Sequence, residues 1–186
     1  MHPDSNTSFI TETNNWIKSV VIGCNFCPFA AKALQMKSIR YVVPSEGNIH
    51  QVLTTLITEC IYLDENEDTE TTIIILPNDF SAFNDYLDLI DKAQQLIAKE
   101  DYEGIYQLAS FHPLYCFEGV PKDDAANYTN RSPYPMLQIL REDSITKALK
   151  NFPDPDSIPE KNIEYARKKG LEYMEVLRAK CMSSEN

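Results

Sequence analysis

The segment TTIIIL, residues 71–76, contains the longest apolar run of the chain. Its short length and β-branched side chains predict a strand that is buried on both faces. Apolar residues recur at helical spacing on either side of it, over residues 49–60 and 81–99. Residues 39–43 and 105–111 read as the neighbouring strands. Because strands and helices alternate, we expect βαβ units and a sheet that is at least partly parallel.

Further elements extend this pattern towards both ends of the chain. Gly23 is expected to cap the first helix, and Pro28 to begin the second. These elements cover residues 8–22, 28–34, 136–141, 144–151 and 160–179. The predicted fold class is α+β, an α/β sandwich in which about four strands form a mixed, partly parallel sheet packed with about five or six helices. An elaborated ferredoxin-like fold is the alternative.

Length and composition indicate one globular domain. The 186 residues favour a single domain over residues 1–186. The hydrophobic fraction of 43% is ordinary for a protein with a packed core. Residues 1–7 and 180–186 are expected to be flexible tails.

The charge balance argues against nucleic acid as a partner. The formal net charge is -11, and the 17 Lys and Arg residues are scattered. Their one short cluster, Arg167-Lys168-Lys169, reads as a solvated helix face, whereas a nucleic-acid-binding protein usually shows a basic patch or stripe. The five glycines form none of the glycine-rich phosphate-binding motifs, which argues against a standard nucleotide fold.

The expected compartment is the cytoplasm. The first residues lack the basic and then apolar stretches of a secretion signal. No run approaches the ~20 apolar residues of a membrane helix, so no membrane association is expected. The five cysteines are an odd number, which favours reduced thiols in such a chain. The sequence leaves the oligomeric state open.

Cys27 is the first candidate catalytic residue. It precedes Pro28 at the expected start of a helix, where backbone N–H groups and the helix dipole favour a thiolate and lower its pKa. The alternative is an inert thiol buried under the first helix. Cys24 and Cys27 also form a C-x-x-C pair, but the preceding segment reads as helix, which is the wrong context for a thioredoxin-like site.

His112 is the second candidate, at the point where a strand enters a long irregular segment, residues 112–135. It could act as a general acid or base, or its ring could be satisfied by the loop backbone. With Cys24, Cys27 and Cys116 it also supplies four ligands of the kind that zinc prefers. Zinc is therefore an alternative, although no metal or other cofactor is predicted outright.

Polar residues in the same long segment could bind an anion. Arg131 lies close to Asn127 and Asn130, between prolines that stiffen the backbone. A guanidinium in such a setting can hold a carboxylate or phosphate with two hydrogen bonds. Alternatively, Arg131 pairs with Asp123 or Asp124 and holds the loop closed.

Four motifs resemble a known family. They are NFCPFA at residues 25–30, IRYVV at 39–43, ASFHP at 109–113 and TNRSPYP at 129–135. They are similar to the domain-of-unknown-function family fourteen-fifteen of bacterial and plant proteins, over nearly the whole chain. The resemblance implies no particular activity.

The family pattern selects among the candidate residues. It carries the thiol at Cys27 and the imidazole at His112. It also carries the polar side chains of the long segment, at Asp123, Asp124, Asn127, Asn130 and Arg131. It does not call for cysteine at Cys24 or Cys116, which weakens the dithiol and zinc interpretations. It often has histidine where this chain has Gln138, so a role for that position stays open.

The function predicted from these residues is a small-molecule site, in the form of an enzyme acting on a small anionic substrate. Cys27 would be the nucleophile and His112 its base or orienting partner. Asn127, Asn130 and Arg131 would contact the anionic group, with Asp124 orienting Arg131. A non-catalytic ligand- or peptide-binding domain and a zinc-stabilised domain are the alternatives.

Overall fold

The computed structural model describes residues 5–45, 47–150, 152 and 154–183. The chain forms two compact units, and each is described by itself. The first comprises residues 1–31, 111–134 and 152–186, and the second comprises residues 32–110 and 135–151. Within the described residues, seven α-helices accompany one four-stranded mixed sheet. The predicted α+β class is therefore confirmed, whereas a single domain over the whole chain stays a prediction.

The sheet of the second unit has the strand order β1-β2-β4-β3. Its strands are β1 (Ile39–Val42), β2 (Thr71–Ile75), β3 (Tyr106–Phe111) and β4 (Met136–Arg141). β1 and β2 run parallel, whereas β2 and β4 run antiparallel. The predicted βαβ connection is present, because α3 (Ile49–Glu65) links the two parallel strands. Every residue of β2 is buried, as its continuous apolar run predicts.

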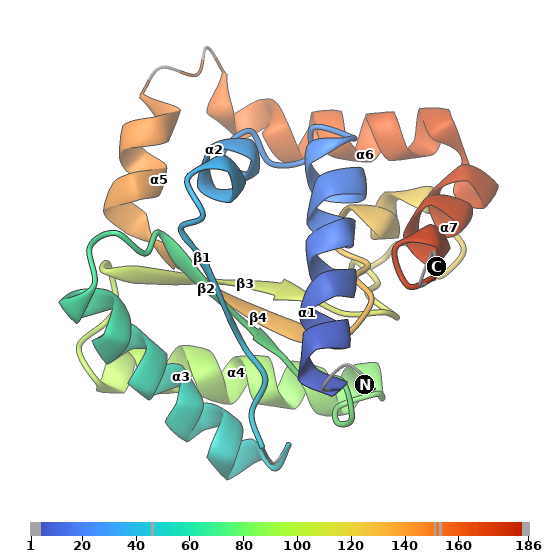
Figure 1. Cartoon of the computed structure of the whole chain (residues 1–186). Helices are drawn as coiled ribbons and strands as arrows, with labels where there is room; N and C mark the ends of the chain where they lie inside the picture. Colours follow the sequence, from blue (N-terminus) through green and yellow to red (C-terminus); the bar gives the residue numbers. More distant parts are fainter. Residues whose placement is uncertain (1–4, 46, 151, 153, 184–186) are drawn as a thin grey trace. The chain divides into compact units, whose positions relative to one another are not determined.

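The core of the second unit lies between the sheet and two helices. α3 and α4 (Phe83–Lys99) lie side by side along one face of the sheet (Figure 1). Their apolar stripes, with Leu56 and Leu89 fully buried, meet Ile74 of β2 and Leu137 of β4. α5 (Glu142–Leu149) follows directly on β4 and contacts it. The helical spacing of apolar residues in the sequence thus matches the faces that are buried.

Three side-chain hydrogen bonds join elements of this unit. The buried carboxylate of Glu59 accepts hydrogen bonds from Arg40 Nε at 2.7 Å and Thr72 Oγ1 at 3.2 Å. The Gln138 amide donates to Thr71 Oγ1 at 3.1 Å, across β4 and β2. The position at which the family pattern often has histidine therefore carries a strand-pairing contact here.

Arg141 and Asp64 make polar contacts at the C-terminal end of α3. The Arg141 guanidinium donates to the carbonyls of Asn66 and Thr69, which lie just beyond the helix. Asp64 accepts a hydrogen bond from the Tyr102 hydroxyl at 2.9 Å. Burial, followed by this bond to Asp64, raises the pKa of Tyr102 to about 12. A cation at the carbonyl end of a helix is favourably placed.

The first unit is built from helices and the long segment. α1 (Ser5–Trp16) continues into the π-helix η1 (Ile17–Ile22), and a 3-10 helix, η2 (Ala125–Thr129), lies within the long segment. α6 (Ile158–Lys169) packs against η2, and α7 (Leu171–Lys180) contacts both η1 and η2. The 3-10 helix η3 (Pro155–Ser157) also belongs to this unit, whereas α2 (Ala30–Gln35) begins in the first unit and has most of its residues in the second.

The predicted tails belong partly to helices. Residues 5–7 open α1, Lys180 closes α7, and Cys181 is buried. Residues 1–4 and 184–186 of the predicted tails lie outside the described residues. No helix in the described part of the chain is long and apolar enough to cross a membrane.

Gly23 caps the first helix in a way that the sequence does not predict. Its φ is -61°, so it has right-handed helical geometry and not the left-handed one common at glycine caps. Its N–H donates to the Lys18 carbonyl at 3.0 Å, the spacing of a π-helix. A Cβ at this position would lie 2.3 Å from the Ser19 carbonyl oxygen, so close packing requires glycine here.

The predicted helix over residues 160–179 is wrong in one respect, because it breaks at Gly170. This residue has φ of 88° and ψ of 159°, a conformation that is essentially restricted to glycine. The break separates α6 from α7 and turns Tyr173 outward, with 42% of its surface exposed.

Candidate functional site

Asn127 organises the long segment of the first unit. Its side chain is fully buried within η2. Oδ1 accepts the Phe117 backbone N–H at 3.0 Å, and Nδ2 donates to the Pro121 carbonyl at 2.8 Å. Both ends of the amide therefore bond the loop backbone, as is usual for a buried polar side chain. Its predicted contact with a substrate stays a prediction.

Arg131 stabilises the same segment through hydrogen bonds to two of its backbone carbonyls. Its Nε donates to the Tyr115 carbonyl at 2.9 Å, and its Nη2 donates to the Lys122 carbonyl at 2.7 Å. The guanidinium carbon lies 4.8 Å from the centre of the Tyr128 ring, a cation–π geometry. The backbone of Arg131 is also fixed, because Trp16 Nε1 donates to its carbonyl at 3.1 Å. This arginine is held rigidly and half-buried.

Asp124 does not pair with Arg131, contrary to both sequence-based interpretations of this residue. Its carboxylate accepts from Nε and Nη2 of Arg167 on α6, at 3.1 and 2.9 Å. It also caps η2 by accepting the Ala126 N–H at 2.8 Å. The Arg167 bonds, and then the Ala126 bond, lower the pKa of Asp124. The predicted orienting role is wrong because Arg167 engages this carboxylate and Arg131 bonds carbonyls.

His112 is completely buried, and its ring bonds the loop backbone. Nδ1 accepts the Leu114 N–H at 2.9 Å. A neutral imidazole with an accepting Nδ1 carries its proton on Nε2. The His112 backbone N–H donates to the Asn130 carbonyl at 3.2 Å, and Asn130 Oδ1 accepts from Thr129 Oγ1 at 2.9 Å. The backbone bond between His112 and Asn130 thus holds the beginning of the long segment against a residue near its end.

Cys27 has the predicted cap geometry but not the predicted pKa. The chain turns at Asn25, which has φ of 56°, and the backbone N–H groups of Phe29 and Ala30 bond the Cys27 thiol at the start of α2. Burial nevertheless raises the pKa of Cys27, more than these two bonds lower it. The expectation of a lowered pKa is wrong, because desolvation of a thiolate outweighs two backbone dipoles.

The predicted zinc ligands do not form a cluster. Among the described residues, which include Cys24, Cys27, His112 and Cys116, no group of three His, Cys, Asp or Glu side chains is placed to hold a metal ion. Cys24 is buried and hydrogen-bonds the Tyr165 side chain. Cys116 Sγ instead contacts the Val120 carbonyl at 3.3 Å. The zinc alternative stays a prediction, without support from the positions of these four side chains.

Arg178 is a candidate residue that sequence reasoning missed. It lies on α7, and its Nη1 donates to the Pro113 carbonyl at 2.8 Å. Burial lowers the pKa of Arg178, and the positive charge of Arg131 lowers it further, against the opposing effects of Tyr128 and Glu175. Arg131 and Arg178 therefore lie close enough to repel each other. No local sequence signal pairs them, because they belong to a loop and a distant helix.

The two arginines lack an ion pair. In the described part of the chain, no carboxylate lies within ion-pair distance of Arg131 or Arg178. Their partners are neutral carbonyl groups of Pro113, Tyr115 and Lys122, which satisfy N–H groups but do not cancel charge. Arg131 and Arg178 are thus two neighbouring half-buried cations, and the carboxylate of Glu175 acts on Arg178 only from beyond ion-pair distance.

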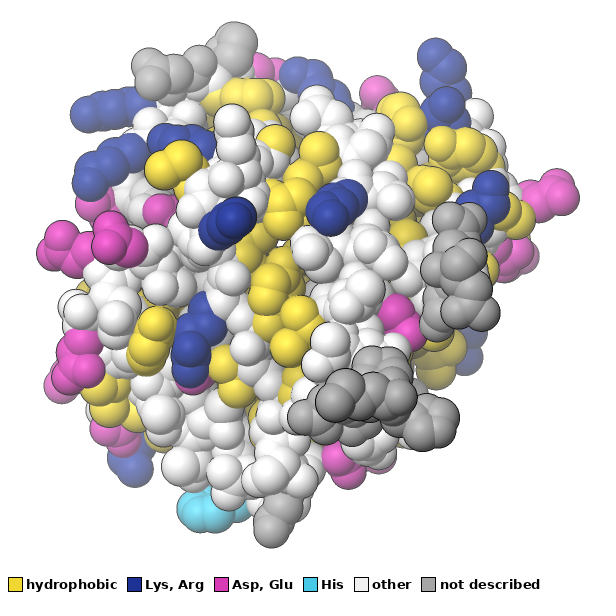
Figure 2. All heavy atoms as spheres, in the orientation of Figure 1, with side chains coloured by type: hydrophobic (Ala, Val, Ile, Leu, Met, Phe, Trp, Pro, Cys, Tyr) yellow, Lys and Arg dark blue, Asp and Glu magenta, His cyan; other side chains and the backbone are white. Residues whose placement is uncertain are grey.

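Charge elsewhere is mixed. On the face that Figure 2 shows, Lys and Arg side chains are interspersed with Asp and Glu and with uncharged groups. This face carries no continuous basic stripe of the kind expected for a nucleic-acid-binding surface. The lack of a nucleic-acid partner stays a prediction.

The comparisons with known proteins identify the family. The searches of curated proteins and of solved structures gave no match. A family model described as "Protein of unknown function (DUF1415)" matches residues 8–176, which is most of the chain. This match confirms the resemblance carried by the four sequence motifs. The chain therefore belongs to the DUF1415 family, whose description assigns no activity.

Proposed function

We propose that this protein binds a small anionic molecule through Arg131 and Arg178. The observation that carries the proposal is the closeness of two half-buried guanidinium groups without a carboxylate partner in the described residues. Glu175 offsets the charge of Arg178 only from beyond ion-pair distance, so a bound anion in direct contact would offset the mutual repulsion of the two arginines more fully.

The geometry leaves donors for such a ligand. A guanidinium carries five N–H donors. Arg131 directs Nε and Nη2 to loop carbonyls, and Arg178 directs Nη1 to Pro113. The remaining N–H groups are suited to the oxygen pairs of a carboxylate or phosphate, which arginine binds with two parallel bonds.

The surrounding bonds would keep the site rigid. Asn127 fixes the backbone of the segment, and Tyr128 lies against the Arg131 guanidinium. A side chain that is already held in place loses little conformational freedom on binding. The predicted contacts of Asn127 and Asn130 would then act indirectly, by fixing the loop that carries Arg131.

Stabilisation by inorganic phosphate tests this proposal. The chain has one tryptophan, Trp16, which is buried in the first unit, so its fluorescence reports unfolding of that unit. A ligand that binds only the folded state stabilises by ~2.7 kcal/mol at a concentration of about 100 Kd. We expect phosphate to stabilise the protein saturably, at constant ionic strength.

Matched variants separate binding from general charge effects. Arg178→Gln should lose the phosphate-dependent increment, whatever its own stability. Lys168→Gln removes an exposed cation of the same unit and should retain the increment. Equal increments in both variants would show that phosphate acts on overall charge, and the proposal would fail.

A Cys27 enzyme is the second candidate function. The half-buried Cys27 thiol receives two backbone N–H groups, which support a thiolate once it forms. His112 would act on it as base or orienting group, and the arginines would hold an anionic substrate. Alkylation of Cys27 against pH provides the test, with His112→Asn retaining an acceptor near Nδ1. Cys27 reactivity that is unchanged in this variant would rule out the pairing.

A further inference from the structure

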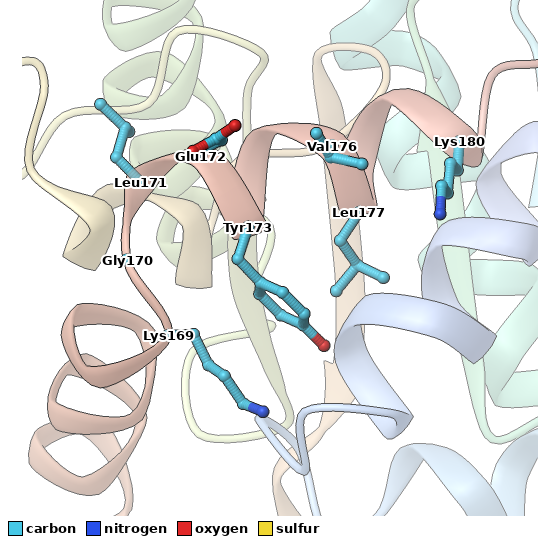
Figure 3. Close-up of a pocket in the computed structure, with 8 residues that line it drawn as sticks. All are labelled: Lys169, Gly170, Leu171, Glu172, Tyr173, Val176, Leu177 and Lys180. Carbon is cyan, nitrogen blue, oxygen red and sulfur yellow. The ribbon is translucent and has the colours of Figure 1, made fainter.

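A depression in the surface of the first unit follows the start and outer side of α7 (Figure 3). Its volume is about 500 Å³, within the usual range of ligand pockets. Figure 3 shows Lys169, Tyr173, Leu177 and Lys180 directed to the same side of the chain. The depression forms because the helix breaks at Gly170. This break places Lys169, the last residue of α6, beside the first turn of α7.

We propose that this depression binds an amphiphilic carboxylate, a molecule with an apolar body and one anionic head. The site uses residues other than Arg131 and Arg178, so it is independent of the function proposed above. Its occupant follows from two features of the lining, an apolar floor and two cationic ends. Glu172 also lines the depression, but Figure 3 shows its carboxylate directed away from Lys169 and Lys180.

The apolar floor is formed by side chains one helical turn apart. Tyr173 and Val176 are 42% and 48% exposed, and Leu177 is half-buried beside them. Removing such surface from water contributes about 25 cal/mol per Å². Tyr173 and Lys180 are two helical turns apart, so the floor is about 10 Å long. This length suits an extended alkyl body.

Both ends of the floor carry an ammonium group. Lys169 Nζ lies 4.9 Å from the Tyr173 ring centre and 5.5 Å from the Tyr165 ring centre, which fixes it at one rim. Lys180 lines the other end. In the described residues, no carboxylate lies within ion-pair distance of either lysine. Charge complementarity therefore favours an anionic head over a cationic one.

Decanoate is the probe, followed by amide NMR of the full-length protein. We expect saturable shifts confined to residues 169–180, with no such shifts from acetate or from the cationic decyltrimethylammonium. Lys169→Gln should weaken decanoate binding about three- to fivefold, the range of one exposed ion pair. Equal binding of decyltrimethylammonium would overturn the proposal, because the lysines would then play no part.

Val176→Asp places a carboxylate in the middle of the floor and should abolish binding. Ile61→Asp is its matched control, because Ile61 is 47% exposed on a helix of the second unit. Retained binding in Val176→Asp would overturn the proposal, as would wild-type self-association that Val176→Asp removes without any decanoate binding. In the last case a second copy of the chain would occupy the surface.

Discussion

Replacing Asn127 by alanine should strongly destabilise the first unit. The side chain is fully buried, and it satisfies the Phe117 N–H and the Pro121 carbonyl at 3.0 and 2.8 Å. Alanine would leave one donor and one acceptor without these partners. Each such buried group costs ~1–3 kcal/mol, so the expected loss is about 2–4 kcal/mol once water entry is allowed for.

Asn127→Asp separates the two bonds. The carboxylate can still accept the Phe117 N–H, but it faces the Pro121 carbonyl without a proton to donate. Protonation restores a donor, so the folded state should raise the pKa of this Asp above its unfolded value of about 3.9. Stability of this variant should therefore be higher at acid pH and decrease as pH rises through the folded-state pKa.

Denaturant unfolding followed by Trp16 fluorescence measures these changes in the first unit. Asn84→Ala is the control, because Asn84 is exposed on α4 and its loss should change stability by less than about 0.5 kcal/mol. An Asn127→Ala variant as stable as Asn84→Ala would refute the assignment of Asn127 as the organiser of the loop.

Three further perturbations test other parts of the fold. Burial raises the pKa values of Tyr41 and Tyr102 to about 12, so stability should be full below pH 10 and decrease as pH approaches 12, alongside tyrosinate absorbance. Glu59→Gln should lower the free energy of unfolding by ~1–3 kcal/mol, because it weakens the buried hydrogen bond to Arg40. Circular dichroism during denaturant unfolding measures this change, and an unchanged free energy would contradict the expectation. Gly170→Ala should cost ~1–3 kcal/mol from backbone strain alone, since no atom lies within 4 Å of the new Cβ, and an unchanged melting temperature would contradict it.

Local patterns in the sequence predict the elements well. The continuous apolar run of β2 indicates a strand buried on both faces, and the structure buries all of it. Helical spacing locates α3 and α4, because their core contacts recur once per turn. Pro28 predicts the start of the second helix two residues too early, because α2 begins at Ala30, but the N–H groups of Phe29 and Ala30 do bond the Cys27 thiol.

Features that depend on distant residues could not be predicted. The pKa of Cys27 depends on burial by other segments, which the residues around a thiol do not reveal. Asp124 forms its ion pair with Arg167 of α6, although Arg131 is nearer in sequence. The approach of Arg178 to Arg131 results from the packing of α7 against the long segment. The break at Gly170 was missed because the apolar period continues across it.

The most direct test of anion binding observes the guanidinium groups themselves. NMR of arginine Nε–H resonances during a phosphate titration distinguishes the arginines, and Arg141 is the internal reference because it too bonds backbone carbonyls. Saturable shifts at Arg131 and Arg178, with Arg141 unchanged, are the predicted result. Shifts of equal size at all three, or none at Arg131 and Arg178, would contradict an anion site in the first unit.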